Sequence, residues 1–132
     1  MIVGIGTDIV YISHFQQAFS QMGEKGKQRL FTSAEQAYAA ARKTLSLQTY
    51  AKRFAAKEAV AKALGTGIGT VSWTQIEVVN NEQGAPAVQL SGQAAELLAS
   101  KGNHPKIHLS LSDDGDYALA FVVIEADAPE NG

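Results

Sequence analysis

The sequence predicts a single α+β domain in which an antiparallel sheet packs with helices, one of them long and central. With 132 residues, of which 45% are hydrophobic, the chain is large enough to bury one core. Its local patterns follow in the order strand, helices, hairpin, helix, hairpin, which is typical of α+β domains. The apolar runs closest to the two ends are expected to be neighbouring strands of one sheet. We expect the domain to span residues 1–126, with a loose tail over 127–132.

Composition excludes several classes of function. The net charge of -2, from 11 basic and 13 acidic residues, gives no overall attraction to nucleic acid or to an anionic membrane. The absence of cysteine excludes disulfides, thiolate metal sites and a cysteine nucleophile. The N-terminus lacks a basic leader, and no apolar run approaches the ~20 residues of a membrane span. We therefore expect a cytoplasmic protein with no nucleic-acid or membrane partner.

The first expected element is a short buried strand. Ile2–Ile5 is a run of mostly β-branched apolar residues. Gly6 and Thr7 are expected to end this strand. Asp8 then lies at the strand exit, where aspartate acts either as a turn or cap residue or as a functional group. The strand alone leaves both interpretations open.

Two helices are expected next. Ser13 and Gln16 have the spacing of a capping box, and apolar residues then recur every three or four positions. A polar, cationic link over 23–29 follows this first helix. Thr32 and Glu35 form a second capping-box pair, which predicts a helix running toward residue 43.

The long central helix is expected over Leu47–Leu64. Alanine, lysine, glutamate and leucine dominate this segment and are strong helix formers, and Gly65 suits a left-handed C-terminal cap. Phe54, Glu58 and Lys62 recur every four residues, so they share one stripe of the helix. Glu58 and Lys62 form either an ordinary surface ion pair or part of a functional site, and helical spacing alone does not decide between them.

A glycine-rich turn and a hairpin follow the central helix. Three alternate glycines over 65–69 allow the backbone to approach a ligand closely, but the run matches neither the P-loop nor the dinucleotide pattern. Ile76–Val79 and Ala87–Leu90 are expected to pair as strands across a turn-rich connection. Ser91 is expected to cap a short helix that ends near Lys101.

The C-terminal segment predicts a second hairpin. Lys106–Ser112 alternates strictly between apolar and polar residues, so one face meets the core and the other meets water or lines a site. The polar face carries His108, Ser110 and Ser112. A turn over 113–116 leads into Tyr117–Glu125, whose nearly continuous apolar run predicts burial on both faces.

Cations concentrate in the first half of the chain. Nine of the eleven lie there: Lys25, Lys27, Arg29, Arg42, Lys43, Lys52, Arg53, Lys57 and Lys62. This asymmetry indicates either a local anionic ligand or a solvated helical surface.

The oxygen ligands suggest one kind of chemistry. Asp8 after a strand and Glu58 on a helix could converge on Mg²⁺, which takes one or two carboxylates and is completed by waters and substrate phosphates. Lys62, Arg53 and the glycine-rich turn could hold the rest of a phosphate-bearing ligand. Such a site suits phosphoryl transfer, in which the protein mainly positions groups and offsets charge. No histidine pair has metal-ligand spacing, and no nucleophilic triad is identifiable.

Two blocks of this sequence resemble a known family. Residues 4–10, together with 53–59 and 62–67, are similar to the signature blocks of the holo-[acyl-carrier-protein] synthase family, the small bacterial 4'-phosphopantetheinyl transferases. The similarity extends over 84–86 and 107–125, and so covers nearly the whole chain. The resemblance implies the 4'-phosphopantetheinyl transferase fold.

The resemblance also implies an activity and a site. Family members transfer 4'-phosphopantetheine from coenzyme A to a serine of acyl carrier protein, which supports fatty acid biosynthesis and releases adenosine 3',5'-bisphosphate. Asp8 and Glu58 match the Mg²⁺ ligands, Lys62 matches a phosphate contact, and these three are the candidate catalytic residues. Segments similar to the coenzyme-binding walls contain Arg53, Phe54, Gly65, Thr66, Gly67, Pro86 and Ser110. The base is either Glu58 or a metal-activated water, and a homotrimer with the coenzyme cleft between subunits is implied.

Three positions depart from the family pattern. Tyr11 and His14 stand where the family often has Glu and Arg, and that arginine is similar to one that grips the acidic carrier helix. Possible substitutes are Lys25, Lys27 and Arg29. Many members have histidine at the position of Asp113, which offers a phosphate no attraction and receives no role here.

Two alternative functions remain open. One is a Mg²⁺-dependent pyrophosphate hydrolase that uses the same carboxylates, and the other is a non-catalytic scaffold that binds a carrier or a nucleotide.

Overall fold

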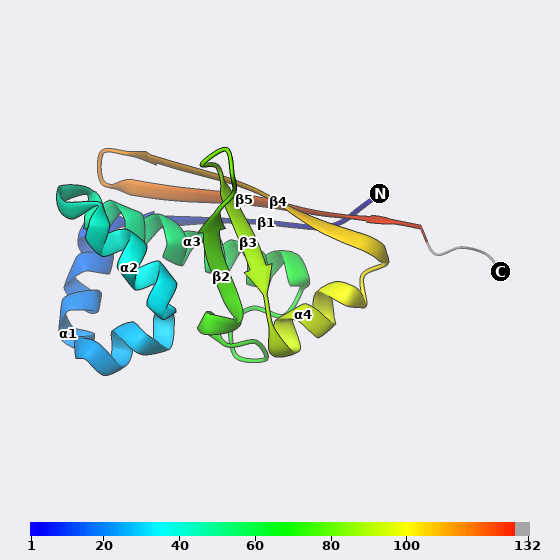
Figure 1. Cartoon of the computed structure of the whole chain (residues 1–132), viewed down its shortest axis with the longest axis horizontal. Coiled ribbons are helices and arrows are strands. Elements are labelled where there is room, and N and C mark those ends of the chain that lie inside the picture. The colour runs from blue at the N-terminus through cyan, green and yellow to red at the C-terminus, as the bar shows by residue number, and fades with distance from the viewer. Residues whose placement is uncertain (129–132) are drawn as a thin grey trace.

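The computed structural model describes residues 1–128 and has the predicted α+β architecture (Figure 1). A three-stranded antiparallel sheet has the order β1-β5-β4, and β2 and β3 form a separate hairpin. The strands are β1 (Ile2–Tyr11), β2 (Ile76–Asn80), β3 (Pro86–Leu90), β4 (Asn103–Asp114) and β5 (Tyr117–Asp127). The helices are α1 (Ile12–Leu30), α2 (Ser33–Ala41), α3 (Ser46–Leu64) and α4 (Gly92–Ala99), with 3₁₀ turns at Lys43–Leu45 and Trp73–Gln75.

The expected pairing of the terminal strands is confirmed, since β1 lies antiparallel to β5. The central helix α3 and the β2–β3 hairpin are also confirmed, and Gly65 ends α3 in the left-handed conformation with φ 88°. Residues 129–132 of the predicted tail lie outside the described residues. None of the described helices combines the length and apolar character that a bilayer crossing requires.

The predicted end of β1 at Gly6 is wrong. The strand continues to Tyr11, and Asp8 lies within it, opposite Ala120 of β5. The glycines serve a different purpose, because they let α3 lie directly on β1. A Cβ atom on Gly6 would stand 1.9 Å from the Ala59 carbonyl oxygen, and one on Gly4 would stand 2.2 Å from the Ala63 carbonyl oxygen. Asp8 is therefore held beside α3 by the rest of the strand.

We expect Gly6→Ala to lower the free energy of unfolding by about 3 kcal/mol, at the upper end for overpacking, because its methyl group meets helix backbone that must shift. Urea denaturation followed by circular dichroism measures the loss. Gly84→Ala is the matched control, since the Cβ there meets open space and only its positive φ is penalised. That variant should lose about 1 kcal/mol. Equal losses in the two variants would contradict close contact between β1 and α3.

The first helix differs from its prediction in two respects. Ser13 does not cap α1; its amide and hydroxyl donate to the Asp116 carboxylate, at 2.9 and 2.6 Å, and tie the helix to the β4–β5 turn. The segment 23–29 is helical and is the second half of α1, after a kink at Gly23 with φ 69°. Glycine adopts this φ without the steric penalty that side chains incur there, so the helix changes direction at that residue.

The second capping box is confirmed. The Thr32 amide donates to Glu35 Oε1 at 2.9 Å, and the Glu35 amide donates to Thr32 Oγ1 at 3.2 Å. Ser91 does precede α4, but its hydroxyl makes no capping hydrogen bond with the described residues.

A buried ion pair joins α2, α3 and the β2 segment. Lys57 and Glu35 are both fully buried, and Lys57 Nζ donates to Glu35 Oε1 at 2.8 Å. The same ammonium also donates to the carbonyl oxygens of Trp73 and Ile76, at 2.9 and 2.6 Å. Glu35 Oε2 in turn accepts from the Val78 amide at 2.9 Å. Lys57 is therefore neither a solvated surface cation nor a ligand contact, the two roles expected for the cation-rich half.

The sheet has one covered face and one open face. The helices lie on a single side of it in Figure 1, and α3 covers the inner face. Strand β5 alternates between buried and exposed residues, so the predicted burial of both faces is wrong within this chain. We call the exposed side the outer sheet face. It carries Ile5 and Ile9 (58% and 59% exposed), Leu119 and Phe121 (40% and 47% exposed), and, on β4, the polar residues His108, Ser110 and Ser112.

Candidate active site

Asp8 of β1 and Glu58 of α3 line one groove, which has a volume of about 390 Å³. The glycine-mediated contact between β1 and α3 brings these two elements together. Asp8 was predicted at a strand exit and Glu58 on a helix, and the structure brings the two carboxylates to the same site. Both carboxylates therefore face one groove and are close enough for the charge of Asp8 to act on Glu58.

Lys62 lies one helical turn after Glu58 and pairs with the other carboxylate. Its ammonium donates to Asp8 Oδ1 at 3.1 Å and to the Thr7 carbonyl oxygen at 2.9 Å. The ordinary Glu58–Lys62 surface pair is therefore not the arrangement in the structure. Lys62 keeps 52% of its side chain exposed, so its charge is available to a ligand in solution.

Glu58 is destabilised in its charged form. Burial raises the pKa of Glu58 above its ordinary value of 4.5, and the negative charge of Asp8 raises it further, while Lys62 partly opposes both effects. A divalent cation between the carboxylates would offset this repulsion. Within residues 1–128 no cluster of three or more histidine, cysteine, aspartate or glutamate side chains is placed to share a metal. Two carboxylates with room for water and phosphate oxygens fit Mg²⁺.

The rest of the groove is lined mainly by apolar residues, several of them aromatic. Phe54 stacks on Trp73, with ring centres 4.9 Å apart, and packs against Phe15 at 5.3 Å. His14 lies at the rim with its ring 5.0 Å from that of Tyr11. Tyr11 and His14, two of the three residues that depart from the family pattern, therefore line the same groove as the carboxylates.

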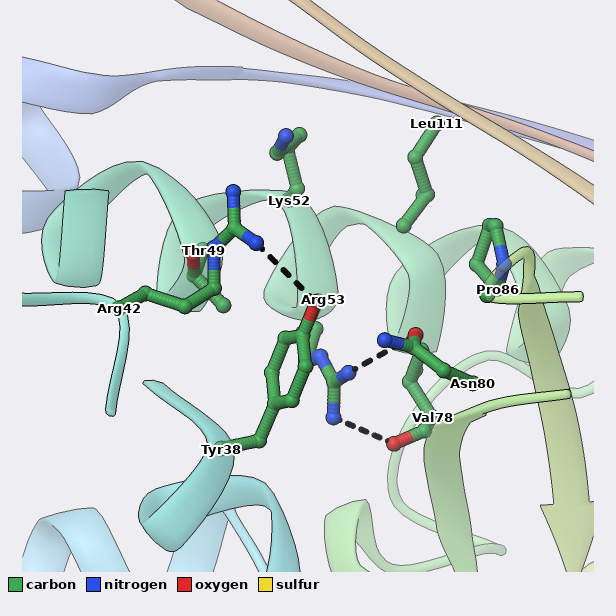
Figure 2. Close-up of a pocket in the computed structure, with 10 residues that line it drawn as sticks. Tyr38, Arg42, Thr49, Lys52, Arg53, Val78, Asn80, Pro86 and Leu111 are labelled. Carbon is green, nitrogen blue, oxygen red and sulfur yellow. Dashed lines mark hydrogen bonds between the residues drawn. The ribbon is translucent and has the colours of Figure 1, made fainter. Parts of the chain in front are cut away.

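A second cavity, of about 170 Å³, lies between α2, α3 and the β2–β3 hairpin (Figure 2). We call it the cationic pocket. Its lining residues are Tyr38, Arg42, Thr49, Lys52, Arg53, Val78, Asn80, Gly84, Pro86 and Leu111. Arg53 and Pro86, both predicted to bind the coenzyme, meet here.

Arg53 forms one wall of the cationic pocket. Its guanidinium lies 4.0 Å from the centre of the Tyr38 ring and donates to the Val78 carbonyl oxygen at 2.6 Å (Figure 2). A longer bond of 3.4 Å reaches Asn80 Oδ1. Burial lowers the pKa of Arg53, although nearby Glu35 opposes the shift.

Tyr38 is held by polar partners on several sides. A hydrogen bond with Asn80 lowers the pKa of Tyr38, burial acts in the opposite direction, and the charges of Arg42 and Arg53 lower it further. With Lys52 as a third cation in the wall, the pocket suits an anionic group beside a flat, partly apolar one.

The other predicted coenzyme-binding residues lie elsewhere. Phe54 faces the carboxylate groove, although it follows Arg53 directly. The amides of Gly65, Thr66 and Gly67 donate to carbonyl oxygens of the last turn of α3, so they cap the helix. Ser110 lies on the outer sheet face, opposite Phe121. A single chain does not bring all these residues into one cavity.

Eight lining residues of the cationic pocket were not predicted as site residues, and they include Tyr38, Arg42, Lys52 and Asn80. The concentration of cations in the first half of the chain gave a signal for the two basic ones. The tyrosine and the asparagine had no signal, because their place depends on how the hairpin packs beside α2.

Known proteins match this chain over nearly its full length. Residues 4–122 match the family model of the 4'-phosphopantetheinyl transferase superfamily. A holo-[acyl-carrier-protein] synthase of Cereibacter sphaeroides is 48% identical over 130 residues, covering 96% of this chain and 94% of that protein. The enzyme of the same name from Sphingopyxis alaskensis is also 48% identical over 130 residues, with 96% and 98% covered.

Solved structures agree with the sequence matches. The crystal structure of a holo-[acyl-carrier-protein] synthase from Neisseria meningitidis has a TM-score of 0.82 at 39% identity and covers 95% of this chain and 99% of that chain. The Bacillus anthracis synthase, in complex with CoA (3',5'-ADP), has a TM-score of 0.77 at 36% identity, with 96% and 99% covered. This chain therefore belongs to the 4'-phosphopantetheinyl transferase superfamily, with the holo-[acyl-carrier-protein] synthases.

Proposed function

We propose that this protein transfers 4'-phosphopantetheine from coenzyme A to a serine of apo acyl carrier protein, in a Mg²⁺-dependent reaction of the cytoplasm that supports fatty acid biosynthesis. The observation that carries the proposal is the convergence of Asp8, Glu58 and Lys62 on one groove. The crystal structure of the Bacillus anthracis relative is that of a complex with CoA (3',5'-ADP), which supports coenzyme A as co-substrate.

Asp8 and Glu58 are proposed to hold the metal, and Lys62 to contact the pyrophosphate of the coenzyme. Bound Mg²⁺ would offset the negative charge that builds on the pyrophosphate oxygens during transfer. The serine oxygen attacks the phosphorus that carries pantetheine, the bond to the bridging oxygen breaks, and adenosine 3',5'-bisphosphate leaves. The base that accepts the serine proton is either the Glu58 carboxylate or a water that the metal would activate.

The coenzyme is proposed to lie between subunits of a homotrimer. The predicted binding residues occupy different sides of one chain: Arg53 and Pro86 in the cationic pocket, and Ser110 on the outer sheet face. We propose that Gly65, Thr66 and Gly67 add a wall at the end of α3, and Phe54 one in the groove. The outer sheet face exposes several large apolar residues, which is typical of an interaction surface.

Phe121→Asp should convert the assembly to monomers, because it places a charge at the centre of the outer sheet face. Sedimentation velocity measures the mass, and we expect transfer to fall at least about tenfold if the site spans subunits. The control is Gln93→Asp on exposed α4. A monomeric wild-type chain with full activity would exclude the trimer.

His14→Arg should tighten binding of the acidic carrier by about two- to fivefold, because arginine places a permanent positive charge at the groove rim. The Kd is measured with apo carrier at low ionic strength. Gln93→Arg adds the same charge away from the groove and should leave the Kd unchanged. Equal gains in the two variants would show a non-specific charge effect.

Mass spectrometry of the carrier distinguishes the three candidate functions. The protein is incubated with coenzyme A, Mg²⁺ and apo carrier. A carrier that gains one phosphopantetheine supports the transferase, whereas coenzyme cleavage without carrier labelling supports the pyrophosphate hydrolase. An unlabelled carrier with intact coenzyme supports the scaffold.

A further inference from the structure

The three cations of the cationic pocket differ in how strongly other residues of the protein already bind their charged groups. Arg53 is committed to the wall through Val78, Asn80 and the Tyr38 ring. The Arg42 guanidinium donates one long hydrogen bond, of 3.4 Å, to the Tyr38 hydroxyl and lies 5.7 Å from the centre of the Tyr38 ring, so it remains available to an anion. Lys52 forms a close ion pair outside the lining residues, with Asp113 of β4.

The Lys52–Asp113 pair joins a lining residue of the pocket to a carboxylate on β4. Lys52 Nζ lies 2.9 Å from Asp113 Oδ1, and the two side chains are 26% and 38% exposed. Asp113 is two residues beyond Leu111 on β4, so both side chains are on the face that meets α3. Figure 2 shows both Lys52 and Leu111 on the side of the cavity that is closer to the strands of the sheet.

An anion that pairs with the Lys52 ammonium comes close to the Asp113 carboxylate, because the two side chains are 2.9 Å apart. A partly exposed ion pair is weak, so a phosphate can compete with Asp113 for the Lys52 ammonium. The carboxylate stays on its strand after displacement and repels the phosphate, because like charges at short range in a partly buried site are screened only in part. Asp113 therefore opposes anion binding in a pocket that is otherwise cationic.

We propose that Asp113 sets the affinity of the cationic pocket, weakening its hold on the phosphate-bearing end of coenzyme A and on adenosine 3',5'-bisphosphate. This inference rests on the proposed function, which supplies the coenzyme and its product. A weaker hold on the product favours its release after transfer, and product release limits turnover in many enzymes.

Calorimetric titration with adenosine 3',5'-bisphosphate tests the role of Asp113. Asp113→Asn should lower the Kd about fivefold and steepen its dependence on salt, because the freed Lys52 ammonium then pairs with phosphate. In steady-state transfer the same variant should show a lower KM for coenzyme A. Its kcat should not rise.

Two further variants isolate the effect. Asp114→Asn removes a neighbouring charge on the opposite face of β4 and should leave the Kd within about twofold of the wild type. In a Lys52→Met background, Asp113→Asn should change the Kd less than it does alone, since the ion pair is already lost. If the wild type transfers phosphopantetheine but Asp113→Asn leaves the Kd unchanged, or Asp114→Asn tightens it equally, this inference is wrong. A wild type that neither binds the nucleotide nor labels carrier overturns the proposed function instead.

Discussion

Replacing Asp8 by alanine should reduce Mg²⁺-dependent transfer at least about 100-fold, since changes that only touch the neighbours of metal ligands already cost about 10–100-fold. Asp8 is proposed to bind the metal and pairs with the Lys62 ammonium at 3.1 Å, so its loss should disturb both positive groups. The rate of carrier labelling is measured over a range of Mg²⁺ concentrations. Glu96→Gln, an exposed carboxylate on α4, should keep the wild-type rate. Full activity of Asp8→Ala would exclude it as a ligand.

Glu58→Gln should lose activity to a similar extent and yet stabilise the metal-free fold. The folded-state pKa of Glu58 lies above its ordinary value, so the charged form costs stability at neutral pH and that cost disappears as pH falls through the raised pKa. The variant should therefore melt at a higher temperature than the wild type at pH 7 without metal, with the difference shrinking in acid. A wild type that melts higher at pH 7 without metal would contradict this account of the groove.

Lys57→Met should lower the free energy of unfolding by about 3–5 kcal/mol, because it leaves Glu35 buried without its partner. Both side chains are fully buried, and burial lowers the pKa of Lys57 although Glu35 opposes the shift. Urea denaturation measures the loss. Lys106→Met, at an exposed lysine, should change stability by less than about 0.5 kcal/mol.

A double variant checks that the loss comes from the unpaired charge. Glu35→Met combined with Lys57→Met removes both charges and should recover part of the stability, because an apolar pair avoids the desolvation of two ions. The recovery is incomplete, since the Val78 and Thr32 amides lose their Glu35 acceptor. If the double variant lost more unfolding free energy than Glu35→Met and Lys57→Met lose in sum, this explanation would be contradicted.

Local sequence patterns were enough to predict the elements with strong signals. Helix α3 was predictable because its segment is a run of good helix formers that ends at Gly65. The Thr32–Glu35 capping box was predictable because it is a contact within one helical turn. The glycine pair in β1 misled the prediction, because glycine ends strands and also permits close approach. Only the position of α3 distinguishes these two uses.

Charges were the least predictable feature of the site. Lys57 and Lys62 carry the same group on one helix, yet one is fully buried and the other is half exposed. Arg53 and Phe54 are adjacent, but successive helical residues point about 100° apart, so they reach different cavities. Two sequence blocks suggested the carboxylate pair, whose members line one groove in the structure. The aromatic and amide lining of the cationic pocket depends on tertiary contacts alone.

The most direct test of the central claim is metal binding at Asp8 and Glu58. Electron paramagnetic resonance with Mn²⁺ in place of Mg²⁺ counts bound ions per chain in the presence of coenzyme A. We predict one ion per chain in the wild type and an affinity at least about tenfold weaker in Asp8→Asn and in Glu58→Gln, with Glu96→Gln unchanged. Undiminished binding of Mn²⁺ by both groove variants would contradict the assignment of these carboxylates as the metal site.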